Sequence, residues 1–290
     1  MDMTPKKLSF KRMPTSQRIV FIFFWIILMV ICFYNLTIPV FAFVQGLKTH
    51  TEVIIGPFKM PLEAQWRNYI DVFELLRVKR VTFATMTWNT LWISVGSTIL
   101  DALGTFFVVY AVSKYKFPGS SFISWFAIFL IILPDVSGGS GYKLMYELGL
   151  TNSPLYLIST IGTITGSYLL MKGVVDGISW TYAEAAFLDG ANDFQVMFKI
   201  NLPQVVSPML AIMISKFTAN WNAYEQMLLF MPEVPVIAVG IKQFHNEMIY
   251  NVRMDILYAG CFVSAIPLWV LYGVFNKTLL NVSFGGGLKG

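Results

Sequence analysis

The sequence predicts an all-α protein that crosses a membrane several times, and three observations support this prediction. Of its 290 residues, 56% are hydrophobic and only 13% are charged, which is about half the charged fraction of an ordinary soluble domain. The mean hydropathy is +0.63. Several apolar stretches reach the roughly 20 residues that a helix needs to cross a bilayer. This composition is typical of a polytopic membrane protein built from helices.

Six spans are expected, with both termini in the cytosol. A basic tail at residues 1–18 precedes the first span, which is too long to be a signal peptide and has no cleavage site. Basic residues that follow the second span, beginning with Lys114, place that end in the cytosol. Lys143, Lys242 and Arg253 run against this orientation. The spans are expected at residues 19–44, 88–112, 121–133, 154–171, 204–223 and 256–275.

The segments between the spans are more polar. Residues 45–87 are predicted to form a long extracytoplasmic loop with an amphipathic helix near residues 66–80. Residues 135–153 contain several glycines and are predicted to be a flexible loop, since no phosphate-binding sequence accompanies those glycines. Residues 224–255 form another outer loop, and residues 278–290 a glycine-rich cytosolic tail.

The cytosolic loop at residues 173–203 lies between two strongly apolar segments and has a pattern of its own. It is predicted to hold a helix that ends at Gly190, because glycine readily adopts the left-handed conformation just past a helix C-terminus. The pair Ala185–Ala186 favours helix and lets another backbone approach closely. Glu184 has two compatible interpretations. It completes a capping box with Thr181 as the N-cap, or it presents a negative charge to a basic groove on a partner.

Nine residues of this loop form one pattern: Glu184, Ala185, Ala186, Asp189, Gly190, Ala191, Ile200, Leu202 and Pro203. The pattern resembles the cytoplasmic coupling loop of the membrane subunits of binding-protein-dependent ABC importers. In that family the loop consists of two short helices that sit in a groove of the ATP-hydrolysing subunit. Weaker matches elsewhere in the chain are similar to the carbohydrate branch of the family, which includes maltose-type and oligosaccharide-type importers. These matches are Tyr110–Gly119, Trp221–Asn222, Val239–Gly240, Pro267 and Gly287–Gly290.

The resemblance implies a type I ABC importer permease fold, with a five-helix core at residues 88–277. It implies a complex in the cytoplasmic membrane of a prokaryote. The partners would be a second homologous permease, two ATP-binding subunits and an extracytoplasmic solute-binding protein. A sugar or oligosaccharide would then be imported by alternating access. ATP and Mg²⁺ would be bound by the partner ATPase, because this chain contains no P-loop sequence. Neither an enzyme activity nor a bound cofactor is expected on this chain.

Two charged residues depart from the apolar spans that the family leads us to expect. Asp101 lies midway along the second span and Lys216 lies inside the fifth. A charge at the centre of a bilayer costs about 2.5 to 3.5 kcal/mol and usually faces an interior cavity or a partner. Three interpretations stay open. The two residues form a structural pair, or one or both line the transport path and bind the sugar, or Lys216 reaches the interface or the other permease.

Three further residues are candidates for the transport path: Trp221, Asn222 and Tyr224. Aromatic rings stack on sugar faces, and an asparagine amide both donates and accepts hydrogen bonds. The competing interpretation of the aromatic residues is an interfacial belt, where Trp and Tyr are enriched in any membrane protein.

Other classes of function are compatible with parts of the sequence. The alternatives are a permease of the same fold for amino acids, polyamines or phosphate, an ion-coupled transporter in which Asp101 titrates, and a membrane enzyme or sensor.

Cys32 and Cys261 lie in apolar spans, and His50 and His245 lie in outer loops. None of the four has the spacing of metal ligands, so no metal site is expected. The basic pI of about 9.1 is typical of membrane orientation signals and does not indicate nucleic-acid binding.

Overall fold

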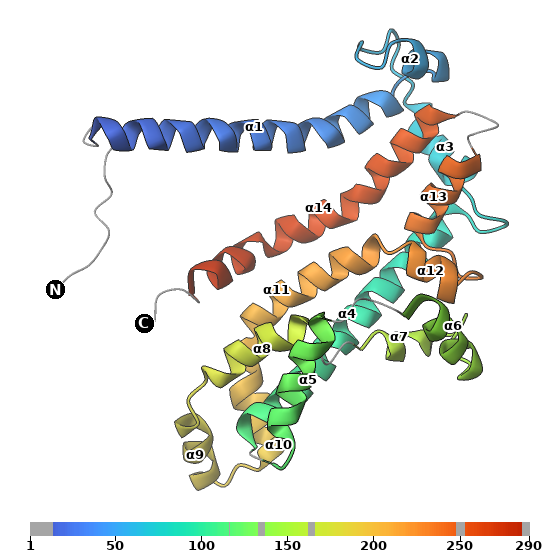
Figure 1. Ribbon diagram of the computed structural model, residues 1–290. Coiled ribbons are helices and arrows are strands. Elements are labelled where there is room, and N and C mark those ends of the chain that lie inside the picture. Colours follow the sequence, from blue (N-terminus) through green and yellow to red (C-terminus); the bar gives the residue numbers. More distant parts are fainter. Residues whose placement is uncertain (1–13, 116, 133–136, 162–165, 248–252, 286–290) are drawn as a thin grey trace.

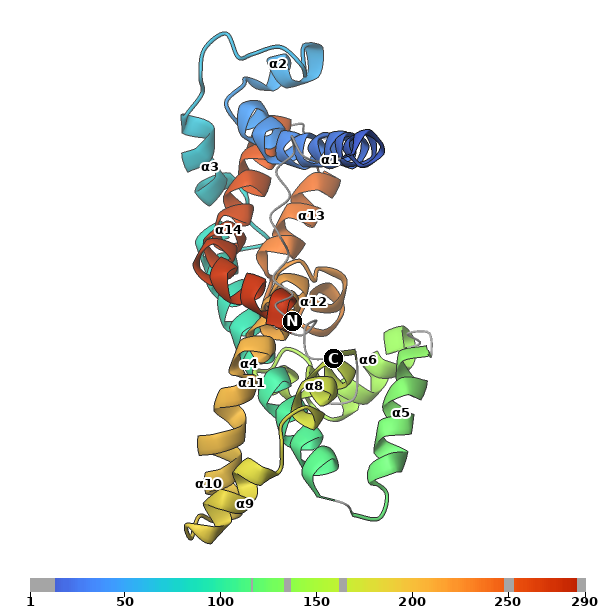
Figure 2. The same cartoon turned by 90° about the vertical axis from the view of Figure 1, so that its left-hand side faces the viewer.

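The computed structural model describes residues 14–115, 117–132, 137–161, 166–247 and 253–285. Within these ranges the chain forms helices joined by short connections, and the one β-bridge described there joins Val78 to Val81. The molecule is elongated. Helix α2 (His50–Ile55) lies at one end and helix α9 (Thr181–Leu188) at the other in both views (Figures 1 and 2). We refer to these as the α2 end and the α9 end.

Four helical segments within the described residues are long and apolar enough to cross a membrane. They are α1 (Thr15–Gly46), α4 (Phe83–Lys114), the run Asp193–Trp221 that ends in α11 (Leu202–Trp221), and the Met254–Lys277 part of α14 (Met254–Gly285). They lie at the first, second, fifth and sixth predicted spans. The prediction of long apolar helices at these four places is therefore confirmed.

The third and fourth predicted spans look different in the structure. Helix α5 (Ser120–Ile132) occupies the third, but its 13 residues are fewer than the roughly 20 that a full crossing needs. The fourth, predicted at 154–171, is not described as one helix. Helix α7 (Tyr156–Ser159) and helix α8 (Gly166–Asp176) occupy its described parts.

Helix α8 also runs past the predicted end of the fourth span. It continues to Asp176, where the carboxylate Oδ2 lies 2.7 Å from Nζ of Lys172 on the preceding turn. A pair of opposite charges four residues apart supports a helix. The first residues of the predicted cytosolic loop are therefore helical.

Two segments predicted as irregular are helical instead. Residues 135–153 contain α6 (Ser137–Glu147), so the prediction of a flexible loop there is wrong. The rings of Tyr142 and Tyr146 stack one turn apart in α6, and Tyr142 also lies 6.3 Å from the ring of Phe230 in α12 (Glu225–Phe230). Ring packing thus supports a helix that the glycines did not suggest.

The predicted C-terminal tail is the second of these segments. Helix α14 continues to Gly285, well past the predicted start of the tail at residue 278. The basic residues of 1–13 and the residues Gly287–Gly290 lie outside the described ranges.

The two largest apolar clusters among the described residues join most of the long helices. The cluster near the α2 end joins α3 (Arg67–Leu75), α4, α11, α13 (Ile237–Glu247) and α14; its fully buried members include Val72, Leu76, Met86, Ile256 and Ala259. The cluster nearer the α9 end joins α4, α5, α8 and α11; its fully buried members include Phe106, Val109, Tyr168, Met171 and Val205. Only α4 and α11 contribute to both clusters. These two helices are therefore the axis of the fold.

Helix α1 is attached to the rest of the chain near the α2 end. There the ring of Phe43 lies 4.9 Å from the ring of Phe262 in α14. Farther along, α1 diverges from α14 (Figure 1), and its apolar side chains from Ile19 to Val40 are exposed on this chain. This part of α1 offers a long apolar surface to its surroundings.

Buried polar groups close the connection between α1 and α3. The Asn68 side-chain amide donates hydrogen bonds to the carbonyl oxygens of Gly46 (3.0 Å) and Lys48 (2.8 Å). The ammonium group of the buried Lys48 donates to the carbonyl oxygens of Gly56 and Pro57. Burial lowers the pKa of Lys48, and the two carbonyl oxygens replace part of its lost hydration.

We predict that Gly260→Ala destabilises the packing of α14. A Cβ atom at Gly260 would lie 2.7 Å from Cδ1 of Leu76, which is fully buried and cannot move aside freely. Overpacking of this kind costs typically about 1 to 3 kcal/mol. Gly273→Ala, in the same helix, is the control, because a Cβ there meets no other described atom within 4 Å. Thermal unfolding of the detergent-solubilised protein measures both variants. Equal stability of the two would contradict the packing argument.

Candidate functional site

The segment at the α9 end is a compact unit. It contains α9, α10 (Asp193–Gln195) and the π-helix η2 (Val196–Asn201), which leads directly into α11. Ala183, Ala186 and Val196 are buried between α9 and η2, with Ile200 packed against them. Of the predicted alanine pair, Ala186 therefore packs inside the loop, whereas Ala185 faces outward.

Gly190 ends α9 as the sequence predicts. Its φ is +85°, and its N–H donates to the carbonyl oxygen of Phe187 at 3.0 Å. The N–H of Ala191 donates to the carbonyl oxygen of Ala186 at 2.9 Å. These two bonds and the left-handed glycine form a Schellman motif. Gly190 is needed here because a residue with a Cβ is disfavoured at this φ.

Of the two interpretations of Glu184, the capping box with Thr181 as N-cap is wrong. Trp180 precedes α9 with helical dihedral angles (φ −66°, ψ −22°), and its side chain makes no capping hydrogen bond. The N–H of Thr181 donates to Oγ of Ser179 at 3.3 Å instead. Thr181 is already inside the helix, whereas an N-cap residue needs a non-helical backbone. The helix N-terminus therefore does not hold the exposed Glu184 carboxylate. A capping box does occur at α10, between Asn192 and Gln195.

Large apolar side chains project from the loop, and the sequence analysis missed them. Leu188 is 89% exposed, directly before the Asp189–Gly190 turn, and Phe194 is 72% exposed. Glu184 and Asp189 are also exposed nearby in the sequence. A surface that combines exposed large apolar groups with acids is typical of a protein contact. The available signal was a large apolar residue directly before an Asp-Gly pair, where a helix ends.

Two hydrogen bonds tie the loop region to the end of α4. The phenol of Tyr115 donates to Oδ1 of Asp193 at 2.6 Å, and the ammonium group of Lys114 donates to the carbonyl oxygen of Ile178 at 2.7 Å. Burial and the bond to Asp193 raise the pKa of Tyr115 well above its ordinary value. Tyr115 therefore stays protonated at neutral pH and remains a donor.

The three predicted loop residues at its C-terminal side lie in the helical run. Ile200 packs on the loop cluster, and Leu202 packs on the cluster nearer the α9 end. Pro203 is exposed in the first turn of α11. These residues form the junction between the loop and α11.

The structure brings Asp101 and Lys216 together across α4 and α11. Oδ1 of Asp101 lies 3.9 Å from Nζ of Lys216. The Asp101 side chain is 1% exposed, whereas that of Lys216 is 29% exposed. One helical turn from Lys216, the Asn220 amide donates to Oγ of Ser97 at 2.7 Å. Polar pairs thus join the two axial helices at consecutive turns.

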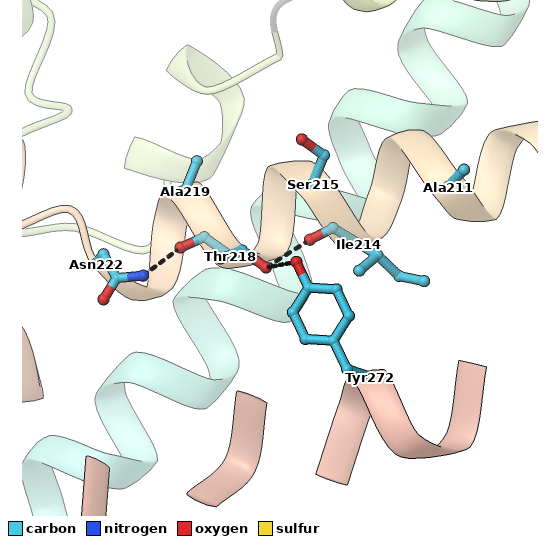
Figure 3. A pocket seen from close by; sticks show the side chains of 7 residues that line it. All are labelled: Ala211, Ile214, Ser215, Thr218, Ala219, Asn222 and Tyr272. Atoms are coloured by element: carbon cyan, nitrogen blue, oxygen red, sulfur yellow. Dashed lines mark hydrogen bonds between the residues drawn. The ribbon is translucent and has the colours of Figure 1, made fainter. Parts of the chain in front are cut away.

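The face of α11 beside this pair is hollowed (Figure 3). A cavity of about 450 Å³ is lined by Ala211, Ile214, Ser215, Thr218, Ala219, Asn222 and Tyr272. The hydroxyl groups of Thr218 and Tyr272 lie 3.3 Å apart (Figure 3). A second cavity, of about 490 Å³, is lined by Lys216, Ala219, Asn220, Asn222, Ala223, Tyr224, Glu225 and Gln226. The two cavities share Ala219 and Asn222 and together form what we call the α11 hollow.

The structure separates the three other path candidates. Asn222 and Tyr224 line the α11 hollow. Trp221 is 2% exposed and lies in the apolar cluster near the α2 end, where its indole N–H donates to the carbonyl oxygen of Ser264 at 3.1 Å. Trp221 therefore packs in the core, because an aromatic ring with a partner for its N–H is stable there. Ser215, Thr218 and Tyr272 join the candidates from the structure alone.

No group of three or more His, Cys, Asp or Glu residues that could hold a metal ion occurs within the described ranges. The arrangement does provide an exposed loop at one end and a polar hollow on an apolar body. This geometry is typical of a helical membrane protein.

Comparison with known proteins identifies the family. No family model matches the chain. The inner membrane ABC transporter permease protein YcjP of Escherichia coli is 24% identical over 249 residues, which is 82% of this chain and 85% of that protein. The maltodextrin transport system permease protein MdxG of Bacillus subtilis is 27% identical, over 80% of this chain and 84% of that protein. The maltodextrin transport system permease protein MalD of Streptococcus pneumoniae is 30% identical, over 70% of this chain and 75% of that protein.

A solved structure has the same fold. It is a bacterial ABC transporter involved in the import of the acidic polysaccharide alginate, and one of its chains superposes with a TM-score of 0.74. That chain is 23% identical, and the match covers 91% of the present chain and 98% of the other. The present chain belongs to the family of ABC importer permease subunits that includes these transport systems. It is a multi-pass protein of the cytoplasmic membrane, and in this family a separate subunit hydrolyses ATP.

We predict that Asp101 and Lys216 stabilise each other as a pair. Each single reversal, Asp101→Lys or Lys216→Asp, places two like charges together in the apolar body and lowers stability. The double reversal restores an attractive pair, with an expected coupling energy of about 0.5 to 3 kcal/mol. Thermal unfolding and the amount of protein in the membrane measure the effect. A double variant no better than the single variants would exclude pairing.

Proposed function

We propose that this chain is one of two permease subunits of an importer that moves a sugar or an oligosaccharide by alternating access. The observation that carries the proposal is the loop at the α9 end, a rigid unit that exposes Leu188 beside acidic residues. Several relatives are named for maltodextrin or galactooligosaccharide transport. Their names support a carbohydrate as the substrate.

The α9 end faces the cytosol in this proposal, and the α2 end faces outward. The chain crosses the membrane six times, with α5 and α8 as the third and fourth crossings and both termini in the cytosol. The cytosolic side is assigned because only there can the loop meet an ATP-binding subunit. Lys114 and Lys172 near the same end agree with the enrichment of basic residues in cytosolic loops.

The loop at residues 182–203 is the coupling loop. Leu188 and Phe194 insert into a groove of the ATPase, and Glu184 and Asp189 face basic residues there. Apolar anchors in a desolvated pocket supply most of the affinity of such a contact. The acids set its orientation and association rate. The buried Ala186 and the left-handed turn at Gly190 and Ala191 hold the loop in shape.

The remaining partners follow from the same arrangement. A second homologous permease completes the membrane unit, and two ATP-binding subunits hold ATP and Mg²⁺. An extracytoplasmic solute-binding protein delivers the sugar to the α2 end. The exposed apolar face of α1 supports burial of this helix against lipid and the second permease.

The α11 hollow is part of the transport path. Its hydroxyl and amide groups match the hydroxyl groups of a sugar, because each donates and accepts hydrogen bonds. Lys216 presents its ammonium group to the hollow while Asp101 stays buried behind it. Asn222 and Tyr224 contact the solute, and Trp221 supports them from the core.

The decisive experiment is affinity purification of the chain from its native membrane in mild detergent, followed by mass spectrometry of the bound proteins. An ATPase subunit and a second permease are the expected partners. Recovery of the chain alone, or only with copies of itself, would contradict the proposal. Uptake of labelled sugars by the purified complex in vesicles then identifies the substrate.

We predict that Leu188→Asp releases the ATPase subunit without preventing membrane insertion. The substitution places a charge where an apolar anchor is buried, which typically costs 2 kcal/mol or more at the centre of an interface. Leu62→Asp is the matched control, because Leu62 is 91% exposed at the opposite end of the chain. Co-purification of the ATPase is the measurement. Equal retention by both variants would argue against this contact.

We also predict that Gly190→Pro uncouples the complex more severely than Glu184→Ala. Proline fixes φ near −65°, whereas Gly190 has a φ of +85°, so the end of α9 must rearrange. Glu184→Ala removes one exposed carboxylate and leaves the loop folded. ATP-driven uptake and ATPase binding measure both variants. Normal values in both would exclude the assignment of the coupling loop.

A further inference from the structure

One turn in the C-terminal part of the coupling loop, directly before α11, is wider than an α-helical turn. The N–H of Leu202 donates to the carbonyl oxygen of Met197, five residues earlier. Before this turn, the N–H of Val196 donates to the carbonyl oxygen of Asn192, four residues earlier. The wide turn, residues Val196–Asn201, therefore interrupts an otherwise regular run from Asp193 to Trp221. Such π-helical turns are rare and frequently occur at functional sites.

Pro203 gives a physical reason for the wide turn. Proline has no N–H, and in a regular helix its ring collides with the carbonyl group four residues earlier, here that of Lys199. An additional residue in the preceding turn changes the position of that carbonyl group. The chain thus enters α11 as a helix without a Pro-induced break at this point.

The side chain of Asn201 bridges the wide turn from inside. It is 2% exposed, and its amide Nδ2 donates to the carbonyl oxygen of Val196 at 3.3 Å. The same Nδ2 lies 3.5 Å from the hydroxyl group of Tyr110 on α4. Asn201 therefore connects both ends of the turn to each other and to the neighbouring axial helix.

The wide turn lies between two packed units. On one side, Val196 is buried in the apolar cluster of the coupling loop. On the other side, Met197 and Leu202 pack on the cluster formed by α4, α5, α8 and α11. The wide turn is the direct connection along the chain from the loop to α11. When the coupling loop moves, this π-helical turn either stays rigid and moves α11 with it, or bends and leaves α11 in place.

We propose that Asn201 is a positioning residue for the coupling of ATP hydrolysis to transport. By holding the wide turn closed and attached to α4, it makes the coupling loop and α11 move together. The inference rests on the proposed function, because it requires that an ATPase moves the loop. A buried amide with only a structural role would affect stability but not the transmission of movement.

The test measures whether nucleotide on the ATPase changes the exposure of α11. The purified complex carries Ala219→Cys in the α11 hollow, with Cys32 and Cys261 replaced by serine. The rate at which a thiol reagent labels position 219 is measured with and without MgATP, together with ATP hydrolysis. This readout requires no knowledge of the transported sugar.

Asn201→Ala is expected to retain ATP hydrolysis while the MgATP-dependent change in labelling rate falls roughly fivefold, the scale of one lost hydrogen bond. Gln204→Ala is the matched control, because its exposed amide donates to the carbonyl oxygen of Ile200 at 2.8 Å just past the wide turn. That variant is expected to match the parent. A parent-like response of Asn201→Ala, or a parent without any MgATP-dependent change, would overturn the inference.

A second measurement applies if Asn201→Ala does not assemble. Hydrogen exchange of the unsubstituted complex is compared with ADP and with a non-hydrolysable ATP analogue. Equal protection of residues 196–203 with both nucleotides supports a turn that stays closed, and loss of protection there with the ATP analogue overturns the inference. Absence of an ATPase from the purified complex would instead contradict the proposed function. The two failures are therefore distinguishable.

Discussion

The structure depends on the contact between α4 and α11, where polar groups inside an apolar body must satisfy one another. Asn220 bonds to Ser97, and Lys216 lies beside the buried Asp101. In a medium without water an unpaired polar group is costly, so these pairs favour one alignment of the two helices along their length. Both apolar clusters are built on the same two helices. The other helices take their positions from this axis.

The same axis connects the two regions to which we assign function. The loop at the α9 end is attached to α4 through the bond between Tyr115 and Asp193, and to α11 through the wide turn. The α11 hollow lies on the other part of that helix. The loop has its own buried cluster and its own helix caps. It is therefore a packed unit and not a flexible connection. A force applied to the loop therefore acts on the helices that carry the hollow.

Sequence signals that depend on a few adjacent residues predict the structure better than signals that depend on packing. The four long apolar helices and the left-handed Gly190 were predicted, because length, hydropathy and glycine conformation are properties of a few adjacent residues. The capping box at Thr181 and the loop at 135–153 were wrong. In both cases packing decided the result. Trp180 adopts a helical backbone within the loop cluster, and the tyrosine rings of α6 pack on one another and on α12.

The sequence by itself determined the class of protein and its main helices. It also singled out Asp101 and Lys216, because charges are rare in apolar spans. Only the tertiary structure decided that these two meet, that Trp221 is buried in the core while Leu188 is exposed, and that Asn201 spans a wide turn. The physical reason is that burial and pairing depend on which distant segments cover a side chain. Apolar character and the formation of the long helices are set locally along the chain.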